Sequence, residues 1–166
     1  MIQKKNQGVE HPISSKKPTS KVKFRAINKT LIIGDSIVKH INQPKIQRAA
    51  RAQSTVLTNS GAKVEDVHTK MNETLQNENY DSIIIHVGTN NLVNKDAESA
   101  ASKMKELIID AKKQVKRVAV SSVIKRYDGR VQPNNLTKFN KLVRDMCIQD
   151  NLTFIRTGRV VEWLIA

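Results

Sequence analysis

The sequence has almost no cysteine, few aromatic residues and no long hydrophobic run. Its single cysteine, Cys147, cannot form an intramolecular disulfide or supply the spaced thiols of a metal site. No apolar run approaches the roughly 20 residues that a transmembrane helix requires. The amino-terminal residues lack an apolar stretch behind their lysines, so we predict no secretory signal and an intracellular location, cytoplasmic or nuclear. A length of 166 residues with 39% hydrophobic side chains fits one domain with a modest core.

Acidic residues are scarce compared with basic ones. The chain has 29 Lys and Arg against 15 Asp and Glu, a net charge of +14. Residues 1–29 hold eight of the basic residues and one acid, which is half of that net charge. A chain this basic attracts polyanions, although solvated lysines on helix faces give the same composition. Neither zinc-finger spacing nor aromatic interleaving specifies a nucleic-acid motif.

Residues 1–28 differ from the rest of the chain. They contain Pro12, Pro18, Gly8 and most of the excess lysine, with almost no periodic hydrophobic residues. A segment with so little apolar surface cannot offset the entropy lost on ordering. We therefore predict a basic disordered tail over residues 1–28 and a folded domain over residues 29–166.

Beyond the tail, apolar runs of strand length alternate with helical stripes. The predicted strands are residues 30–34, 54–57, 82–87, 117–124 and 152–155. The predicted helices are residues 37–41, a segment carrying Val64, Val67, Met71 and Leu75, a long helix capped by Asp96, and one with the stripe Leu136, Phe139, Val143, Met146 and Cys147. This alternation with short links predicts an α/β fold in which helices cover both faces of a parallel sheet.

Small and polar residues follow two of these strands directly. The first apolar run ends in Gly34-Asp35-Ser36, and the third ends in Gly88-Thr89-Asn90-Asn91, with Ser60-Gly61 between them in the sequence. In parallel sheets, ligands bind beyond the carboxyl ends of the strands, where the strand order reverses. Each of these turns is common by itself, but the three in this order are much rarer. We therefore expect them to converge on one site.

These three blocks resemble the SGNH (GDSL-type) hydrolase family. The resemblance implies a flavodoxin-like three-layer α/β/α sandwich with a five-stranded parallel sheet in the order 2-1-3-4-5. It also implies an acyl-transfer site with Ser36 as the nucleophile. The oxyanion hole would comprise the backbone N–H groups of Ser36 and Gly61 and the side-chain amide of Asn90. Gly34, Asp35 and Gly88 would support the turns, with Asp35 accepting hydrogen bonds from nearby amides.

The chain departs from the family pattern in its histidines. The family supplies its general base from an Asp-x-x-His block after the last strand, whereas this chain has histidines only at positions 11, 40, 68 and 86. We expect His86 to be an interior histidine, and His68 to be a solvated or partly buried boundary residue beside the apolar stripe of the second helix. Residues 156–166 take the place of the missing block, which predicts a truncated, alternatively spliced or frame-shifted terminus.

Three functions follow as hypotheses. The first is an SGNH-type esterase acting on a small acyl ester, weak or inactive because general-base assistance is typically worth about 10²–10⁴-fold. The second is a non-catalytic basic binding module of mobile-element type, which binds nucleic acid or another polyanion through its tail. The third is a gene fragment without independent function. The sequence implies no metal or organic cofactor.

Overall fold

A parallel five-stranded sheet forms the centre of the structure. The computed structural model describes residues 28–125 and 128–157. Its strands are β1 (Lys29–Gly34), β2 (Gln53–Thr58), β3 (Ser82–His86), β4 (Arg117–Ser121) and β5 (Thr153–Ile155). They pair in the order β2-β1-β3-β4-β5, and every pairing is parallel. The predicted fold class and strand order are therefore confirmed.

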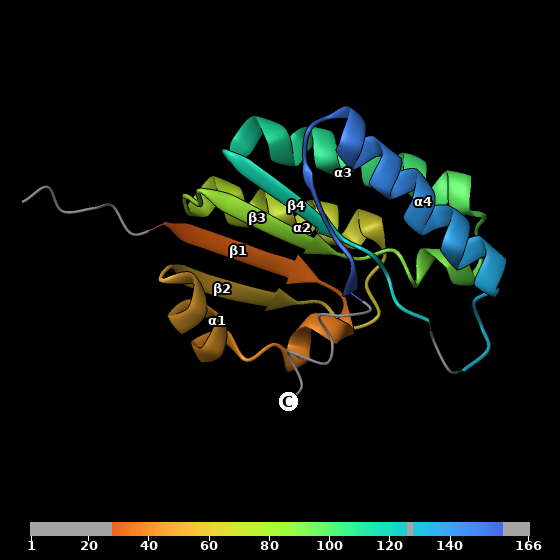
Figure 1. Ribbon diagram of the computed structural model, residues 1–166, viewed down its shortest axis with the longest axis horizontal. Coiled ribbons are helices and arrows are strands. Elements are labelled where there is room, and N and C mark those ends of the chain that lie inside the picture. The colour runs from red at the N-terminus through yellow and green to blue at the C-terminus, as the bar shows by residue number, and fades with distance from the viewer. Residues whose placement is uncertain (1–27, 126–127, 158–166) are drawn as a thin grey trace, which may run out of the picture.

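Helices connect the strands and cover the sheet. They are the 3₁₀ helices η1 (Ser36–His40) and η2 (Asn91–Val93) and the α-helices α1 (Gln43–Ala50), α2 (Val64–Asn77), α3 (Ala97–Gln114) and α4 (Pro133–Gln149). Right-handed crossovers place α1 on one face and α2, α3 and α4 on the other, because the step from β1 to β2 runs opposite to the later steps. Figure 1 shows α1 beside β2 at one side of the sheet, with α3 and α4 toward the other.

The middle of the central strand β1 is apolar because both of its faces are buried. Leu31, Ile32 and Ile33 of β1 are all at most 2% exposed, although neighbouring side chains of a strand point to opposite faces. An uninterrupted apolar run is what a doubly covered parallel strand requires. The main core lies between the sheet and α2, α3 and α4, where the helix stripes pack against Leu31, Ile33 and their neighbours. At the start of α3, the predicted cap is confirmed, because the Asp96 carboxylate accepts the Ser99 N–H at 2.6 Å.

Two elements differ from the prediction. Helix α1 was not expected, because it buries no residue and its amphipathic signal is short. It is held by polar contacts instead: Asn42 caps it through the Lys45 N–H at 3.0 Å, and the Gln47 side chain donates to the Ser54 carbonyl at 3.0 Å. Strand β4 ends at Ser121, not at residue 124. The Asn140 side chain bonds both the N–H and the carbonyl of Val123 at 2.9 Å, which removes these groups from strand pairing.

Two predictions concern residues outside the described ranges. These are the disordered tail over residues 1–28, apart from Asn28, and the altered terminus, apart from Arg156 and Thr157. Both stay predictions. None of the helices in residues 28–125 and 128–157 combines the length and the hydrophobicity that a membrane span requires.

Candidate active site

The turn after β1 is locked against β3. A Cβ atom at position 34 would lie 2.1 Å from the carbonyl oxygen of His86, so only glycine lets the two backbones approach this closely. The next residue, Asp35, donates its N–H to that same carbonyl at 3.1 Å. The position of the turn is therefore fixed by main-chain contacts, before any side chain contributes.

Asp35 shapes the turn from inside. Its side chain is almost completely buried, and its Oδ1 accepts the N–H of Ile37 at 3.0 Å, which caps the 3₁₀ helix η1. This hydrogen bond joins the Asp35 side chain to a nearby amide of the same turn. Ser36 follows at the first position of η1 and is exposed, so the surface of this turn presents its side chain to solvent.

The second turn, residues 58–62, lies beside the first. The N–H of Asn59 donates to the Gly34 carbonyl at 2.9 Å, and the N–H of Ala62 closes the turn onto the Asn59 carbonyl at 3.1 Å. Gly61 has a φ of +75° and is exposed, and a Cβ atom there would meet no other atom within 4 Å. Its glycine is favoured by the left-handed backbone and not by crowding.

The third turn is supported by α4 and reaches the second. Gly88 has a φ of +133°, and a Cβ atom there would lie 2.5 Å from the ring of Phe139. Two residues later, the side-chain amide of Asn90 donates to the Ala62 carbonyl at 3.0 Å. Because Ala62 follows Gly61 directly, this bond places Asn90 next to the second turn. The three turns therefore meet at the carboxyl ends of β1, β2 and β3, toward which the arrowheads point in Figure 1.

A polar network behind Asn90 was not predicted from the sequence. Asn91 is 1% exposed, and its Oδ1 accepts the N–H of Val64 at 2.9 Å while its Nδ2 donates to Glu65 at 2.8 Å. Lys95 donates to the other oxygen of Glu65 at 3.1 Å. The network ties the start of α2 to the third turn. Its only sequence signal was a second asparagine after Gly-Thr-Asn.

The charge of Glu65 is stabilised by this network. Desolvation is the largest single influence and raises the pKa of the carboxyl group. The hydrogen bond from Asn91, a backbone hydrogen bond and the contact with Lys95 together outweigh it and lower the pKa from 4.5 to about 2. Glu65 is therefore ionised at neutral pH and completes the network as an acceptor.

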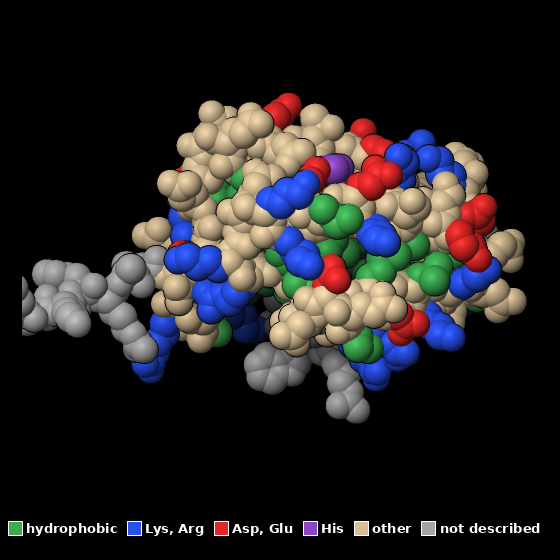
Figure 2. Space-filling model, turned by 90° about the horizontal axis from the view of Figure 1, so that it is seen from above, with side chains coloured by type: hydrophobic (Ala, Val, Ile, Leu, Met, Phe, Trp, Pro, Cys, Tyr) green, Lys and Arg blue, Asp and Glu red, His purple; other side chains and the backbone are tan. Residues whose placement is uncertain are grey.

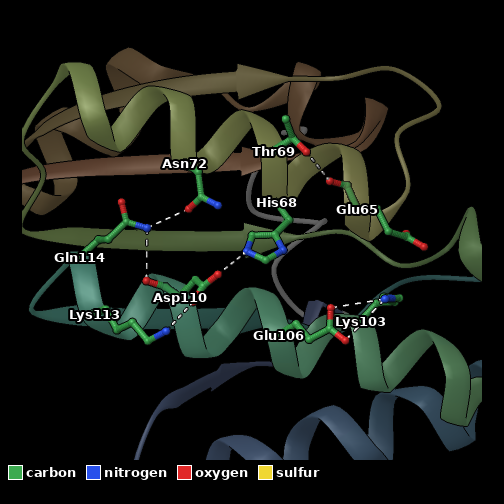
Figure 3. Close-up of polar contacts among 9 residues, drawn as sticks. All are labelled: Glu65, His68, Thr69, Asn72, Lys103, Glu106, Asp110, Lys113 and Gln114. Atoms are coloured by element: carbon green, nitrogen blue, oxygen red, sulfur yellow. Dashed lines mark hydrogen bonds and ion pairs between the residues drawn. The ribbon is translucent and has the colours of Figure 1, made fainter.

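The described part of the chain contains three histidines, His40, His68 and His86. His86 is an interior residue as expected: its Nδ1 lies 2.6 Å from the Ser121 hydroxyl, and its Nε2 has no hydrogen-bond partner among the described residues. Burial lowers its pKa, which the nearby charge of Asp35 only partly opposes, so the ring is neutral at pH 7. His68 is half-buried and engages Asp110 of α3 at 2.9 Å (Figure 3). His40 is exposed on η1.

A separate hollow lies away from the three turns. This hollow is lined by residues 79–81 and 113–116. It lies at the amino ends of β3 and β4, whereas the three turns lie at the carboxyl ends of the strands. It shares no residue with them. Within the described part of the chain, no group of three or more His, Cys, Asp or Glu side chains could hold a metal ion.

The fold is similar to that of several solved hydrolases. A GDSL-like lipase from Bacteroides thetaiotaomicron superposes with a TM-score of 0.65 at 14% identity, over 78% of this chain and 68% of that one. An acetylxylan esterase from Geobacillus stearothermophilus superposes with a TM-score of 0.64 at 15% identity, over 83% of this chain and 80% of that one. An alpha/beta hydrolase from the metagenome of Lake Arreo superposes with a TM-score of 0.68 at 15% identity, over 82% of this chain and 80% of that one. No protein-family model and no curated protein matches the sequence significantly.

These similarities define the class of the molecule at the level of its fold. The strand order, the parallel sheet and the superposition over about 80% of the chain show the SGNH (GDSL-type) hydrolase fold. Sequence identities near 15% support only the assignment of the architecture, because one fold supports many activities.

Proposed function

We propose that the three turns form an acyl-ester hydrolase site with Ser36 as its nucleophile. The hydroxyl oxygen of Ser36 would attack the ester carbonyl as its proton passes to solvent, and the N–H groups of Ser36 and Gly61 and the amide of Asn90 would stabilise the resulting oxyanion. Collapse of this intermediate would release the alcohol, and water would then hydrolyse the acyl-serine to the acid. The main support is the Asn90 side chain, whose bond to Ala62 orients its amide beside Gly61 before a substrate arrives. Preorganised donors of this kind are typically worth about 3 kcal/mol each.

We further propose that hydrolysis by this chain is slow. No histidine follows His86 in the sequence, and His86 itself is buried against Ser121. A serine hydroxyl without a general base typically loses about 10²–10⁴-fold in rate. The remaining acceleration would come from the oxyanion donors and from substrate binding.

Labelling and chemical rescue test this proposal together. We expect a fluorophosphonate probe to label the chain slowly at Ser36, and p-nitrophenyl acetate to be hydrolysed slowly. Added imidazole, a diffusible base, should accelerate both reactions. Ser36→Ala should abolish labelling and the imidazole-dependent rate above solution background. Ser60→Ala is the matched control, because Ser60 is an exposed serine of the neighbouring turn. Equal rates for the two variants, with imidazole present, would exclude Ser36 as the nucleophile.

A second candidate function concerns the amino-terminal segment. Residues 1–29 hold eight Lys and Arg and one acid, which favours binding of nucleic acid or another polyanion. Replacing Lys4, Lys5, Lys16 and Lys17 by Gln should weaken binding of a labelled oligonucleotide and flatten its salt dependence. Undetectable or salt-independent binding by the unchanged chain would exclude this function.

A further inference from the structure

Charge is unevenly distributed in the part of the chain that forms the domain. Residues 36–64 contain five Lys and Arg and no acidic residue. Residues 65–157 contain fifteen Lys and Arg and twelve Asp and Glu. The net charge is thus +5 over the 29 residues from 36 to 64, and +3 over the 93 residues from 65 to 157. The excess belongs to the segment that begins at Ser36.

On the other side of the molecule, basic and acidic side chains are paired. Lys103 lies beside Glu106, and Lys113 beside Asp110, along α3 (Figure 3). Between helices, Lys112 of α3 pairs with Asp150 at the end of α4 at 2.9 Å. Figure 2, which views the molecule from the side of α3 and α4, shows Lys, Arg and acidic side chains interspersed. This face resembles an ordinary solvated surface.

The excess positive charge gathers along the edge of the sheet. Helices η1 and α1 both contact β2, the outermost strand on that side. They carry Lys39, Lys45, Arg48 and, at the end of α1, Arg51, all of them exposed. We call these four residues the cationic edge. Lys45, Arg48 and Arg51 follow one another at three-residue spacing, so they span about 9 Å at the rise of a helix.

Helix α1 is built as a surface element. It buries no side chain, and it is attached to the sheet through the amides of Gln43 and Gln47, which both donate to the Ser54 carbonyl. Lys45 and Arg48 lie on this helix, and Arg51 follows as its C-cap, all three of them exposed. Its composition is therefore explained better by what it presents to solvent than by what it covers.

We propose that the cationic edge binds the phosphodiester backbone of nucleic acid without sequence preference. Ammonium and guanidinium groups form charge-assisted hydrogen bonds with phosphates, and a duplex carries one charge per about 1.7 Å. Residues 36–64 contain no Phe, Tyr or Trp on which a base could stack, so we expect the contacts to be mainly to the backbone. An anionic membrane fits less well: the exposed large hydrophobic residues of the described ranges, Ile109 and Ile148, lie on α3 and α4.

Neutralisation of matched lysines tests the proposal in the full chain. The edge variant is Lys45→Gln, Arg48→Gln and Arg51→Asn, since Asn tolerates the left-handed backbone of residue 51 (φ 48°). The control variant, Lys103→Gln, Lys105→Gln and Lys113→Gln, removes the same charge from α3. Binding of a fluorescein-labelled 20-mer of single-stranded DNA is measured by anisotropy between 50 and 300 mM salt, after thermal unfolding shows that both variants are folded.

The edge variant should bind at least tenfold more weakly at 100 mM salt. Its slope of log K against log salt should fall by about 2, for three lost contacts to a single strand. The control should change less than threefold. Equal losses in the two variants, or no binding by the unchanged chain, would overturn the proposal. Loss of affinity for anionic vesicles alone would assign the surface to lipid instead. Ser36→Ala should bind normally, so failure of the ester hydrolysis proposal leaves this test intact.

Discussion

The turns of the candidate site are built in two different ways. Those at Gly34 and Gly88 have no room for a side chain, because a Cβ atom would lie 2.1 Å from the His86 carbonyl or 2.5 Å from the Phe139 ring. The turn at Gly61 is surrounded by open space and is constrained only by its φ of +75°. The first two glycines are therefore required by the packing of the fold, whatever chemistry occurs there. Gly61 is favoured by the conformation of its own backbone and not by packing.

The largest effect should follow from Gly34→Ala. The atom that a methyl group would meet is main-chain oxygen in the adjacent central strand, which cannot move without disturbing the β1–β3 pairing. We expect a loss of at least about 3 kcal/mol in the free energy of unfolding, at the upper end of overpacking effects. Urea unfolding at 25 °C measures it. A loss below about 1 kcal/mol would show that the strands separate more easily than the close contact implies.

Gly88→Ala should be nearly as costly, but partly correctable. The methyl group would meet the Phe139 side chain, which can be replaced, while the φ of +133° would remain unfavourable. We expect a loss of about 2–4 kcal/mol. Adding Phe139→Leu should recover at least about 1 kcal/mol in a double-mutant cycle. Strict additivity of the two substitutions would show that backbone conformation alone, and not the ring, excludes alanine.

The sequence could predict features that depend on burial or on neighbouring residues, but not features that depend on contacts between distant positions. Strands β1 and β3 were recognisable because burial on both faces leaves an apolar run. The role of Asp35 was recognisable because its partner, Ile37, is two residues away. Helix α1 was missed since it buries nothing, and the end of β4 was misplaced since Asn140, 17 residues further on, bonds Val123.

The unpredicted parts of the site involve long sequence separations. Asn91 bonds Val64 across 27 residues, and His86 meets Ser121 across 35. No spacing rule connects such positions, because their proximity depends on the strand order of the finished sheet. The residues at the turns were visible as motifs, whereas the residues that hold those turns together became visible only in three dimensions.

Gly61→Ala should sharpen the contrast with the two crowded glycines. Nothing lies within 4 Å of the added methyl group, so only the left-handed backbone opposes it, at about 1 kcal/mol. Gly61→Asn should be milder still, since Asn tolerates this conformation. Urea unfolding of both variants provides the measurement. A loss for Gly61→Ala as large as that for Gly34→Ala would contradict the open surroundings of the second turn.

The smallest effect should be a pH dependence from Glu65, behind the third turn. Its pKa is lowered from 4.5 to about 2 in the folded chain, so its ionised form is stabilised by folding. This contribution is fully present above pH 4.5 and is lost as the pH falls toward 2. Because the side chain is 39% exposed, solvent screening limits it to about 1 kcal/mol or less. Unfolding free energies of the chain and of Glu65→Gln at pH 7 and pH 3 measure it.

The two curves should converge at acid pH. Glu65→Gln cannot lose an interaction with Lys95 that it no longer has, so its stability should fall less between pH 7 and pH 3 than that of the unchanged chain. Glu73→Gln is the control on the same helix, because Glu73 is exposed and paired with Lys70 only within α2. If Glu73→Gln flattened the pH dependence as much as Glu65→Gln, the effect would belong to the surface charge of α2. Asn91 would then connect the third turn to α2 through its bond to the Val64 backbone, without a contribution from the charge of Glu65.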